Sequence, residues 1–545
     1  MLRVTIETSL WSRCQAPVAT AVGSIFVLAI AASCRVGPDS TPLQTPDAGV
    51  ATTATFAPPV MTVAEVAADP TAASATAATD VVDVELWWKR FNDPTLDALI
   101  LKADLLNTSI AESFSRIRIK QASLGVSESE LWPTLAAGAG YARVQQNFSQ
   151  LGALGVDVDP YDQWSYGLSM PSWEIDLWGR IASMVASSTS DLEASVDDLR
   201  SAMVSVRAQV ATVYLQVRTL QARLDALNAS IRNLEQTLAL TQQKFDAGTT
   251  TMLSVSQAET NLDLKTAQVP SLRDAVAQST GQLAVLCATN TTEITAILGA
   301  AGPIPTGPDV VNVGLPASLL ERRPDLRAAA LHYDARVAMI GAAEALNYPA
   351  LSLSGNFSIS ATEFNGLGDW SNKAYSFGPS LSLPLFTGWK ISSEIIGAKA
   401  QAELAFNSWR GTLIRAIAEV DTSIAALAFA RESNARYVRA VASASETERL
   451  AAMQYQSGTT TLENLLDVQN NLLSAQDSQA QAQGLAAQSI VELYKSLGGG
   501  WGDAVPAQDS AKTDAKTDAK TAIASAPTSG VSISPVAKAE SGSKE

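Results

Sequence analysis

The chain has one histidine and three cysteines in 545 residues, so it has few of the side chains on which metal sites and nucleophilic catalysis depend. Aromatic residues make up only 6% of the sequence, and Ala, Gln, Ser, Leu and Val dominate it. This composition favours long helices over a set of large compact cores. The formal net charge is −16, and no run of Lys and Arg with interleaved aromatic residues occurs, which argues against a nucleic-acid partner.

The longest N-terminal apolar stretch, residues 18–30, is about 13 residues long and falls short of the roughly 20 that a membrane-spanning helix requires. It suits a secretory signal, because basic residues precede it and the small residues of "AIAASC" end it at Cys34. This ending resembles a bacterial lipobox, which implies diacylglycerol and N-acyl lipid on Cys34. We therefore expect a lipoprotein signal peptide at 1–33. A general signal with an incidental cysteine is the alternative. Arg35, not aspartate, follows the cysteine, and by resemblance to Gram-negative lipoproteins this favours the outer membrane over retention at the inner membrane.

The remaining cysteines leave no pair for a disulfide in the mature chain. Cys14 lies in the expected signal and Cys34 would carry lipid, so Cys287 stands alone in a helical run. No motif connects it to His332, the single histidine. We expect Cys287 to be a small core residue, and we predict no catalytic residue, metal site or other cofactor.

Both ends of the mature chain lack the apolar periodicity of a folded core. The residues after Cys34 are rich in Thr, Ala and Pro, which predicts a flexible tether over 34–85. The segment 502–545 contains "AKTDAKTDAKTA" and is predicted to be disordered. The folded body is therefore expected between about Leu86 and Trp501.

Two very long helices are predicted, over 181–247 and 390–457, because neither stretch contains proline. About 67 residues rising 1.5 Å each make a rod of about 100 Å. In the first rod, apolar residues recur at alternating spacings of four and three, as in a heptad seam. The seam comprises Leu192, Val196, Leu199, Met203, Val206, Val210, Val213, Val217, Leu220, Leu224, Leu227, Ile231, Leu234, Leu238, Thr241 and Phe245.

The same short phrase follows each rod, as "FDAGTTT" at 245–251 and "YQSGTTT" at 455–461. Gly248 and Gly458 stand where a helix C-terminus favours a left-handed residue, and the threonines after them can cap the next helix. Each rod is therefore predicted to turn back as a helical hairpin. A periplasmic coiled-coil spacer or adaptor lipoprotein without a pore would also contain such hairpins, and it is the alternative.

Four shorter segments alternate between apolar and polar residues, which predicts β-strands. In "YPALSLSGNFSIS", Leu351 and Phe357 fall on one face, and Ser352 and Asn356 on the other. An apolar outer face and a polar inner face are typical of a transmembrane barrel wall. Because four strands cannot close a barrel, several chains must share one, and three copies would supply twelve strands. The strands are predicted at about 134–144, 162–173, 350–361 and 374–386.

The order of two strands, a long helix, a turn and a helix occurs twice, so the chain is predicted to be an internal duplication with repeats at 86–312 and 313–501. Two charged phrases are predicted to be structural. "ERRPDL" at 321–326 suits a helix start, with Pro324 and Asp325 in the first turn. Glu174 and Asp176 mark a junction between strand and helix, with Arg180 as a partner.

These features together resemble the TolC-type outer-membrane efflux proteins, in the NodT-like lipoprotein branch of the outer membrane factor family. The resemblance implies a homotrimer with a twelve-stranded β-barrel in the outer membrane, continued by a twelve-helix tunnel across the periplasm. It also implies a periplasmic adaptor and an inner-membrane pump of the resistance-nodulation-division type, and no catalytic cycle in the channel itself. The phrases that carry it are "CRVGPD" at 34–39, "WWKRFNDPTLDALI" at 87–100, "SWEIDLWGRI" at 172–181, "LPASLLERRPDLRAAA" at 315–330, "LPLF" at 383–386 and "LYKSLGGGW" at 493–501.

The resemblance also assigns roles to residues around the two turns. Gly248, Thr249, Gly458 and Thr459 fall at the tips that contact the adaptor in the family. Acidic residues beyond the second turn form the periplasmic gate in the family, and Asp467 matches one of them. The other position is Asn464 in this chain, so one acidic ring is expected to be missing. Glu463 can compensate in part if it faces the lumen, and a solvated surface carboxylate is the alternative reading of Asp467.

Overall fold

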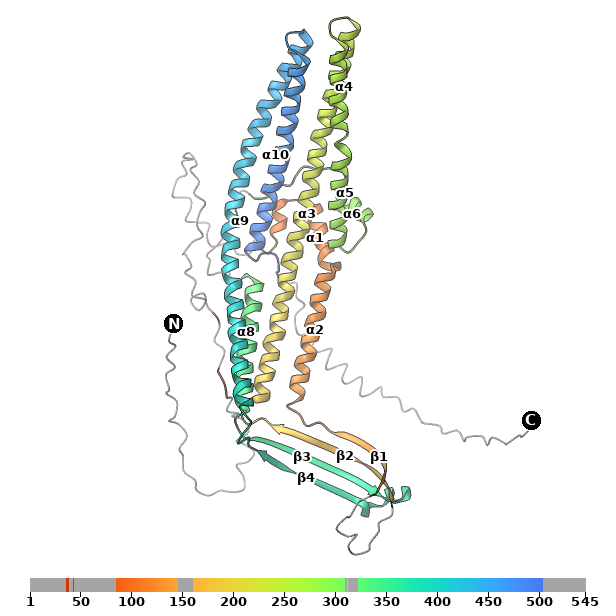
Figure 1. The fold of residues 1–545 in the computed structure, drawn as a ribbon, viewed down its shortest axis with the longest axis vertical. Coiled ribbons are helices and arrows are strands. Elements are labelled where there is room, and N and C mark those ends of the chain that lie inside the picture. Colours follow the sequence, from red (N-terminus) through yellow and green to blue (C-terminus); the bar gives the residue numbers. More distant parts are fainter. Residues whose placement is uncertain are drawn as a thin grey trace, which may run out of the picture. The chain divides into compact units, whose positions relative to one another are not determined.

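The computed structural model describes residues 36–38, 43, 85–145, 160–308, 311 and 322–502. The expected signal, Cys34, most of the tether and nearly all of the C-terminal tail lie outside these ranges. Apart from its last two described residues, the chain forms one unit that ends at Gly500, and the description below concerns this unit. Its elements are η4 (Trp87–Phe91), α1 (Pro94–Leu106), α2 (Thr108–Ser129), β1 (Ala136–Val144), β2 (Tyr161–Ile175), α3 (Arg180–Asp246), α4 (Met252–Thr266), α5 (Val269–Leu286), α6 (Thr291–Leu298), α8 (Pro324–Ala345), β3 (Ala350–Ala361), η7 (Phe364–Gly368), η8 (Trp370–Asn372), β4 (Lys373–Ser382), α9 (Lys390–Ser457) and α10 (Leu462–Ser496) (Figure 1).

The four predicted strands are confirmed, and they form one antiparallel sheet in the order β1-β2-β3-β4. The central pair, β2 and β3, joins the two halves of the chain, with Tyr166 opposite Ile359 and Leu168 opposite Phe357. Among the described residues, β1 pairs only with β2, and β4 pairs only with β3. Each outer strand therefore has one edge of backbone N–H and C=O groups without a partner strand.

The cross-strand register separates apolar from polar side chains, because opposite residues in a sheet point to the same face. Leu351 lies opposite Leu381, and Phe357 opposite Tyr375, whereas Ser352 lies opposite Ser380 and their hydroxyl oxygens are 2.8 Å apart. One face is therefore aromatic and aliphatic, and the other is built from Ser, Gly, Ala and Asn. The two faces that the alternation predicted are confirmed.

One strand boundary was predicted wrongly. The last strand was expected to reach residue 386, but β4 ends at Ser382. Ser382 lies opposite Ala350, the first residue of β3, so the partner strand stops there. Pro384 then follows, and it has no N–H to continue the ladder. A proline also marks the irregularity in β2, where the register shifts between Met170 and Trp173 around Pro171.

The two long helices are confirmed within one residue at each end. α3 has 67 residues and α9 has 68. Most of the heptad seam of α3 is buried, including Leu199, Val210 and Val217 at 0% exposure. The last seam residue, Phe245, is exposed.

The helices pack side by side in one layer. α3 contacts α8 and α10 on one side, and α2, α4 and α5 on the other, while α8 and α10 also contact α9. Figure 1 shows the two long helices, α3 and α9, each running beside shorter helices placed end to end. The sheet lies at one end of these helices, and the turns α3–α4 and α9–α10 lie at the other end.

The short elements η4, α1 and α6 pack on one face of α3. Arg207 of α3 forms an ion pair with Asp104 at 2.8 Å, and Arg218 donates hydrogen bonds to the carbonyl oxygens of Leu298 and Ala300. The Trp87 ring stacks on the Tyr494 ring with centroids 5.6 Å apart. We call η4, α1 and α6 the peripheral segments. They cover one face of the helical layer.

Candidate functional site

The two hairpin turns have the same backbone. Gly248 has φ +71° and Gly458 has φ +79°, in the left-handed region where L side chains are strained. Thr249 donates its N–H to the Lys244 carbonyl oxygen at 2.8 Å, and Thr459 donates to the Gln454 carbonyl oxygen at 2.9 Å. With the glycine N–H bonds to the residue three positions earlier, this is a Schellman motif in both copies. The predicted left-handed glycines are confirmed.

The helices that leave the turns begin differently. The Thr461 hydroxyl accepts a hydrogen bond from the Asn464 N–H at 3.3 Å and caps α10. Thr251 stands at the equivalent position before α4, but its side chain makes no capping bond. The prediction that threonines cap both helices is therefore right for the second turn and wrong for the first. The first-turn N–H groups of α4 therefore lack the side-chain acceptor that Thr461 provides in α10.

The predicted gate residues lie on the first turns of α10. Asp467, Glu463 and Asn464 are all exposed. The side-chain amide of Asn464 donates to the Thr460 hydroxyl at 3.0 Å, so this residue participates in the cap. Asp467 has no hydrogen bond or ion pair within the described part of the chain and presents its carboxylate to solvent. The roles of these residues in a gate, and of the tips in adaptor contact, stay predictions.

A set of contacts between the two hairpins was not foreseen from the sequence. The Tyr455 hydroxyl lies 2.9 Å from the Thr241 hydroxyl, in a buried position. The Lys244 ammonium lies 4.0 Å from the centroid of the Tyr455 ring and also donates to the Tyr455 carbonyl oxygen. These residues are 211 to 214 positions apart. They join the end of α3 to the end of α9.

Apolar packing surrounds this contact. A buried cluster brings together residues of α3, α4, α9 and α10: Leu234, Ala258, Ala451, Tyr455, Leu462, Leu465 and Leu466. Next to it, the Gln469 side-chain amide donates to the Thr237 hydroxyl at 3.1 Å. Three leucines that follow the second turn, Leu462, Leu465 and Leu466, are therefore buried together on one face of α10. The turn at Gly458 separates Tyr455 from these leucines, so no helical spacing in the sequence signals that it packs with them.

The junction between β2 and α3 has the predicted ion pair. The Arg180 guanidinium binds both carboxylate oxygens of Glu174, with the shortest distance 2.8 Å. The Asp176 carboxylate accepts the Ala182 N–H at 2.8 Å, in the manner of a helix cap. Val36, two residues after Cys34, donates its N–H to the Trp178 carbonyl oxygen at 3.0 Å. The chain that follows Cys34 therefore contacts the unit at this junction.

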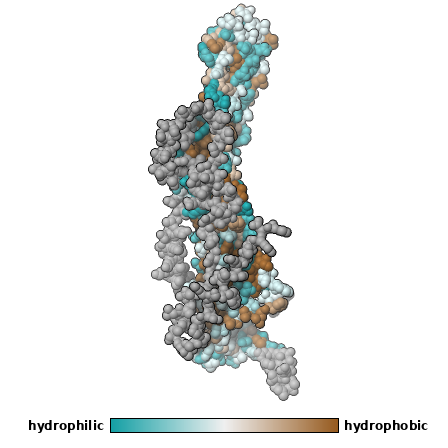
Figure 2. Space-filling view, turned by 90° about the vertical axis from the view of Figure 1, so that its left-hand side faces the viewer, coloured by the Kyte–Doolittle hydropathy of each residue, from teal (hydrophilic) through white to brown (hydrophobic). Residues whose placement is uncertain are grey.

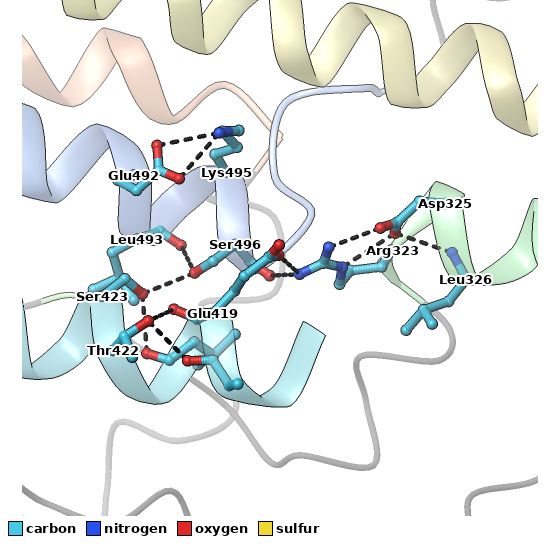
Figure 3. A network of polar contacts seen from close by, with 12 residues as sticks. Arg323, Asp325, Leu326, Glu419, Thr422, Ser423, Glu492, Leu493, Lys495 and Ser496 are labelled. Atoms are coloured by element: carbon cyan, nitrogen blue, oxygen red, sulfur yellow. Dashed lines mark hydrogen bonds and ion pairs between the residues drawn. The ribbon is translucent and has the colours of Figure 1, made fainter. Parts of the chain in front are cut away.

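The start of α8 is confirmed at Pro324, and the arginine before it is a structural hub. Arg323 donates to the Asp325 carboxylate at 2.7 Å, to Glu419 of α9 at 2.9 Å and to the Ser496 carbonyl oxygen of α10 at 2.9 Å (Figure 3). Burial in this position opposes its charge, and the two carboxylates more than offset that cost, so the pKa of Arg323 is raised. The network ties three helices together at one level.

Cys287 is a fully buried core residue, as predicted. Its thiol donates weakly to the Leu99 carbonyl oxygen at 3.7 Å, and burial raises the pKa of the thiol to about 11. A thiol held protonated in this way is a poor nucleophile.

His332 is not near Cys287 in a reactive pair, but lies beside acidic residues of α3. Its Nδ1 is 3.2 Å from an Asp191 oxygen, and its Nε2 is 3.8 Å from an Asp198 oxygen. Hydrogen bonds to these two carboxylates raise the pKa of His332 to about 9, and the pKa of Asp191 falls to about 2.

Over the described ranges, no group of three or more His, Cys, Asp or Glu side chains has the arrangement of a metal site. No helix in those ranges has both the length and the hydropathy needed to cross a membrane.

Comparisons with known proteins agree with this geometry. A family model described as outer membrane efflux protein matches residues 99–289 and 315–499. The pyoverdine export outer membrane protein OpmQ of Pseudomonas aeruginosa is 30% identical over 77% of this chain and 89% of its own length. Nodulation protein T of Rhizobium leguminosarum bv. trifolii is 27% identical over 78% of this chain and 90% of its own. The solved outer-membrane channel OprN has a TM-score of 0.73 at 30% identity, covering 86% of this chain and all of that one.

Proposed function

Since the chain belongs to the outer membrane efflux protein family, we propose that three copies of it assemble around one axis and form the passive duct of a tripartite efflux system. The protein is the outer-membrane channel component of such a system in a Gram-negative bacterium, and it extends into the periplasm. The proposal adds the homotrimer, the twelve-stranded barrel and the twelve-helix tunnel. An inner-membrane pump drives the transport, and this chain carries out no reaction.

The sheet carries the proposal, because within the described residues its two outer edges have no partner strand and most of the large side chains on its apolar face are at least partly exposed. In lipid, an unpaired backbone N–H or C=O costs several kcal/mol, so an open sheet is not stable there. Pairing β4 of one protomer with β1 of the next satisfies both edges at once. Three protomers then supply twelve strands, four from each, which is a size that leaves an open lumen.

The two faces of the sheet indicate which one meets lipid. Phe377 is 79% exposed and Leu381 is 70% exposed in the single chain, and both lie on the apolar face. Such a surface is unfavourable in water and favourable against acyl chains. The opposite face, with Ser352, Ser380 and Asn356, is suited to a water-filled pore. β3 has 12 residues and β4 has 10, close to the length that a tilted strand needs to cross the bilayer.

Exposed apolar residues on the two outer sides of the helical layer support the same assembly. Ile414 and Met453 lie exposed on α9, and Ile119 and Val126 lie exposed on α2. In Figure 2, which faces the α9 side, apolar side chains are visible as brown patches between the grey segments. Packing α9 of one protomer against α2, α4 and α5 of the next would bury both sets.

The remaining roles follow from position. We propose that lipid on Cys34 anchors the protomer beside the strand-to-helix junction, since Val36 binds the Trp178 carbonyl oxygen there. Fully extended, two residues span only about 7 Å. The hairpin tips around Gly248, Thr249, Gly458 and Thr459 would contact a periplasmic adaptor, and a pump of the resistance-nodulation-division type would lie beyond it. Asp467, with Glu463 beside it, would form the gate at the tunnel mouth.

The decisive experiment measures assembly and conductance in one preparation. Detergent-purified protein is expected to have the mass of a trimer by native mass spectrometry. It is also expected to give discrete current steps in planar bilayers. A monomer without conductance would overturn the duct and favour a coiled-coil spacer. The lipid anchor has its own test. Cys34→Ala should leave the conductance intact but abolish the incorporation of a radioactive fatty acid into the protein.

A further inference from the structure

A groove of about 710 Å³ runs along α8, between α3 and α9. Its floor is made of small side chains, Ala328 and Ala329 of α8. Its sides carry Asp198 of α3, His332 and Arg336 of α8, and a row on α9 that recurs at helical spacing. That row is Gln401, Leu404, Ala405, Ser408, Thr412 and Arg415. The volume lies within the range of sites that hold small organic molecules.

The groove opens on the face of the helical layer that the peripheral segments leave bare. Asp198 precedes Arg207, which binds those segments, by nine residues on α3. His332 precedes Gly341, against which Val36 and Gly37 lie, by nine residues on α8. At about 100° per residue, nine residues turn a helix by about 180°. If the duct closes with its peripheral segments outside, which rests on the proposed function, the groove faces the lumen.

The acidic side chains at this groove already have cationic partners. Asp325 is held by Arg323 at 2.7 Å, and Asp198 lies 3.8 Å from the His332 ring. Asp191, just beside the groove, is approached by His332, by Lys120 of α2 at 3.1 Å and by Arg336 at 3.6 Å. A cationic ligand would therefore have to compete with these pairs for each carboxylate.

One cation at the groove has no such partner. Within the described part of the chain, Arg415 makes no hydrogen bond or ion pair, and it is exposed. A guanidinium presents several donors in a planar fork that matches oxygen anions. We propose that this groove is a subsite on the wall of the duct for small amphipathic organic anions, with Arg415 binding the anionic head group. The head group is a carboxylate, phosphate or sulfonate.

The neighbours of Arg415 suit the rest of such a molecule. Ala328, Ala329, Leu404 and Ala405 offer an apolar surface to a ring or short chain. The Thr412 hydroxyl donates its proton to the Ser408 carbonyl oxygen of the same helix at 3.0 Å. It is therefore not needed as a second donor to the head group, which Arg415 binds. In a chain with a net charge of −16, an arginine without a partner among the described residues gives passing anions a local attractive site on the luminal wall.

The test is block of single-channel current in planar bilayers by 1-naphthoate and by 1-naphthyl phosphate, with 1-naphthylmethylamine as the cationic counterpart. Arg415→Gln is expected to raise the blocking concentration of at least one anion about tenfold, the usual value of a charge-assisted hydrogen bond. The two anions distinguish a carboxylate head group from a phosphate. Trimer mass by native mass spectrometry confirms that the variant is assembled.

Arg410→Gln is the matched control. Arg410 is exposed on the same helix, and five residues turn it about 140° away from Arg415. It removes the same charge without touching the groove and should leave block by both anions unchanged. Equal effects of the two variants, or stronger block by the amine than by either anion, would overturn the subsite while leaving the duct intact. A wild type that forms no channel would overturn the duct, and the subsite with it.

Discussion

The two hairpin tips share a backbone but differ in the residue three positions before the glycine. Phe245 at the first tip is 36% exposed, whereas Tyr455 at the second tip is 5% exposed. The glycines have nearly the same φ, and both turns close with the same pair of hydrogen bonds. The repeated phrase therefore determines the turn, and the packing of each tip against its neighbours determines what the side chains do.

The difference arises because α10, the returning helix of the second hairpin, packs against both long helices. Tyr455 of α9 reaches Thr241 and Lys244 of α3, and α10 packs against both long helices. Phe245 of α3 is not a member of the buried cluster that contains Tyr455. The two hairpins have equal turns, and their surroundings differ: within the described residues, the aromatic side chain of the second tip contacts α3 and is buried, whereas that of the first tip is partly exposed.

The largest difference is expected from truncating these two aromatic residues. Tyr455→Ala should lower the local free energy of opening at the second tip by about 3 kcal/mol, because it removes a buried ring and its hydroxyl contact. Phe245→Ala should cost less than about 1 kcal/mol, because its ring is already partly in water. Hydrogen exchange of tip peptides, read by mass spectrometry, measures both. Similar protection losses in the two variants would show that the tips are packed alike.

The glycines should respond equally. Gly248→Ala and Gly458→Ala each put a side chain on a left-handed residue, at a cost of about 1–2 kcal/mol. An added Cβ meets nothing within 4 Å at either position, so only backbone strain is involved. Exchange at the last turn of α3 and of α9 reports the two effects. Unequal losses would mean that the turns differ in ways their common geometry does not reveal.

Removing the threonine that precedes each returning helix should also affect the two tips differently, with a smaller change in stability. Thr461→Ala should weaken the first turn of α10 by about 1 kcal/mol, since it removes the bond to the Asn464 N–H. Thr251→Ala should change α4 by no more than a few tenths of a kcal/mol, because that side chain makes no capping bond. Exchange rates of the amides in the first turn of each helix compare the pair. A loss at α4 as large as that at α10 would contradict the assignment.

The smallest change is expected in the binding of cations to Asp467, the proposed gate residue. Asp467→Asn should weaken the block of channel current by multivalent cations a few-fold, as for one exposed carboxylate per protomer. Glu259 is the first acidic residue after the first tip, and Glu259→Gln is the control. It should leave the block of current by multivalent cations unchanged. Current recordings in the presence of a trivalent cation measure both. Unchanged block in Asp467→Asn would identify this carboxylate as an ordinary surface group.

The periodic features of the chain were predictable because they depend on local spacing. The two long stretches without proline predict α3 and α9 within one residue of their bounds, the heptad seam supports α3, and the alternation at 350–361 matches β3. The end of β4 was not predictable from alternation alone, because it depends on where β3 stops. The failure of Thr251 to cap α4 likewise depends on side-chain geometry that the repeated letters do not specify.

The contacts between distant segments could not be inferred from one sequence. His332 meets Asp191 across 141 positions, and Tyr455 meets Thr241 across 214. Either residue taken alone looks like an ordinary member of a helix. Arg323 was correctly placed before a helix, but its bonds to Glu419 and Ser496 require three helices to converge at one level.

By itself the sequence determined the elements of this protein: two long rods, two glycine turns and four strands with one apolar face. These features arise from the pitch of the helix, the two-residue period of the strand and the steric freedom of glycine, all of which act over a few residues. Only the tertiary structure decided which tip is linked to its neighbour, where the last strand ends and which charges share a groove. Those outcomes depend on distances between segments far apart in the chain, and a local pattern contains no information about such distances.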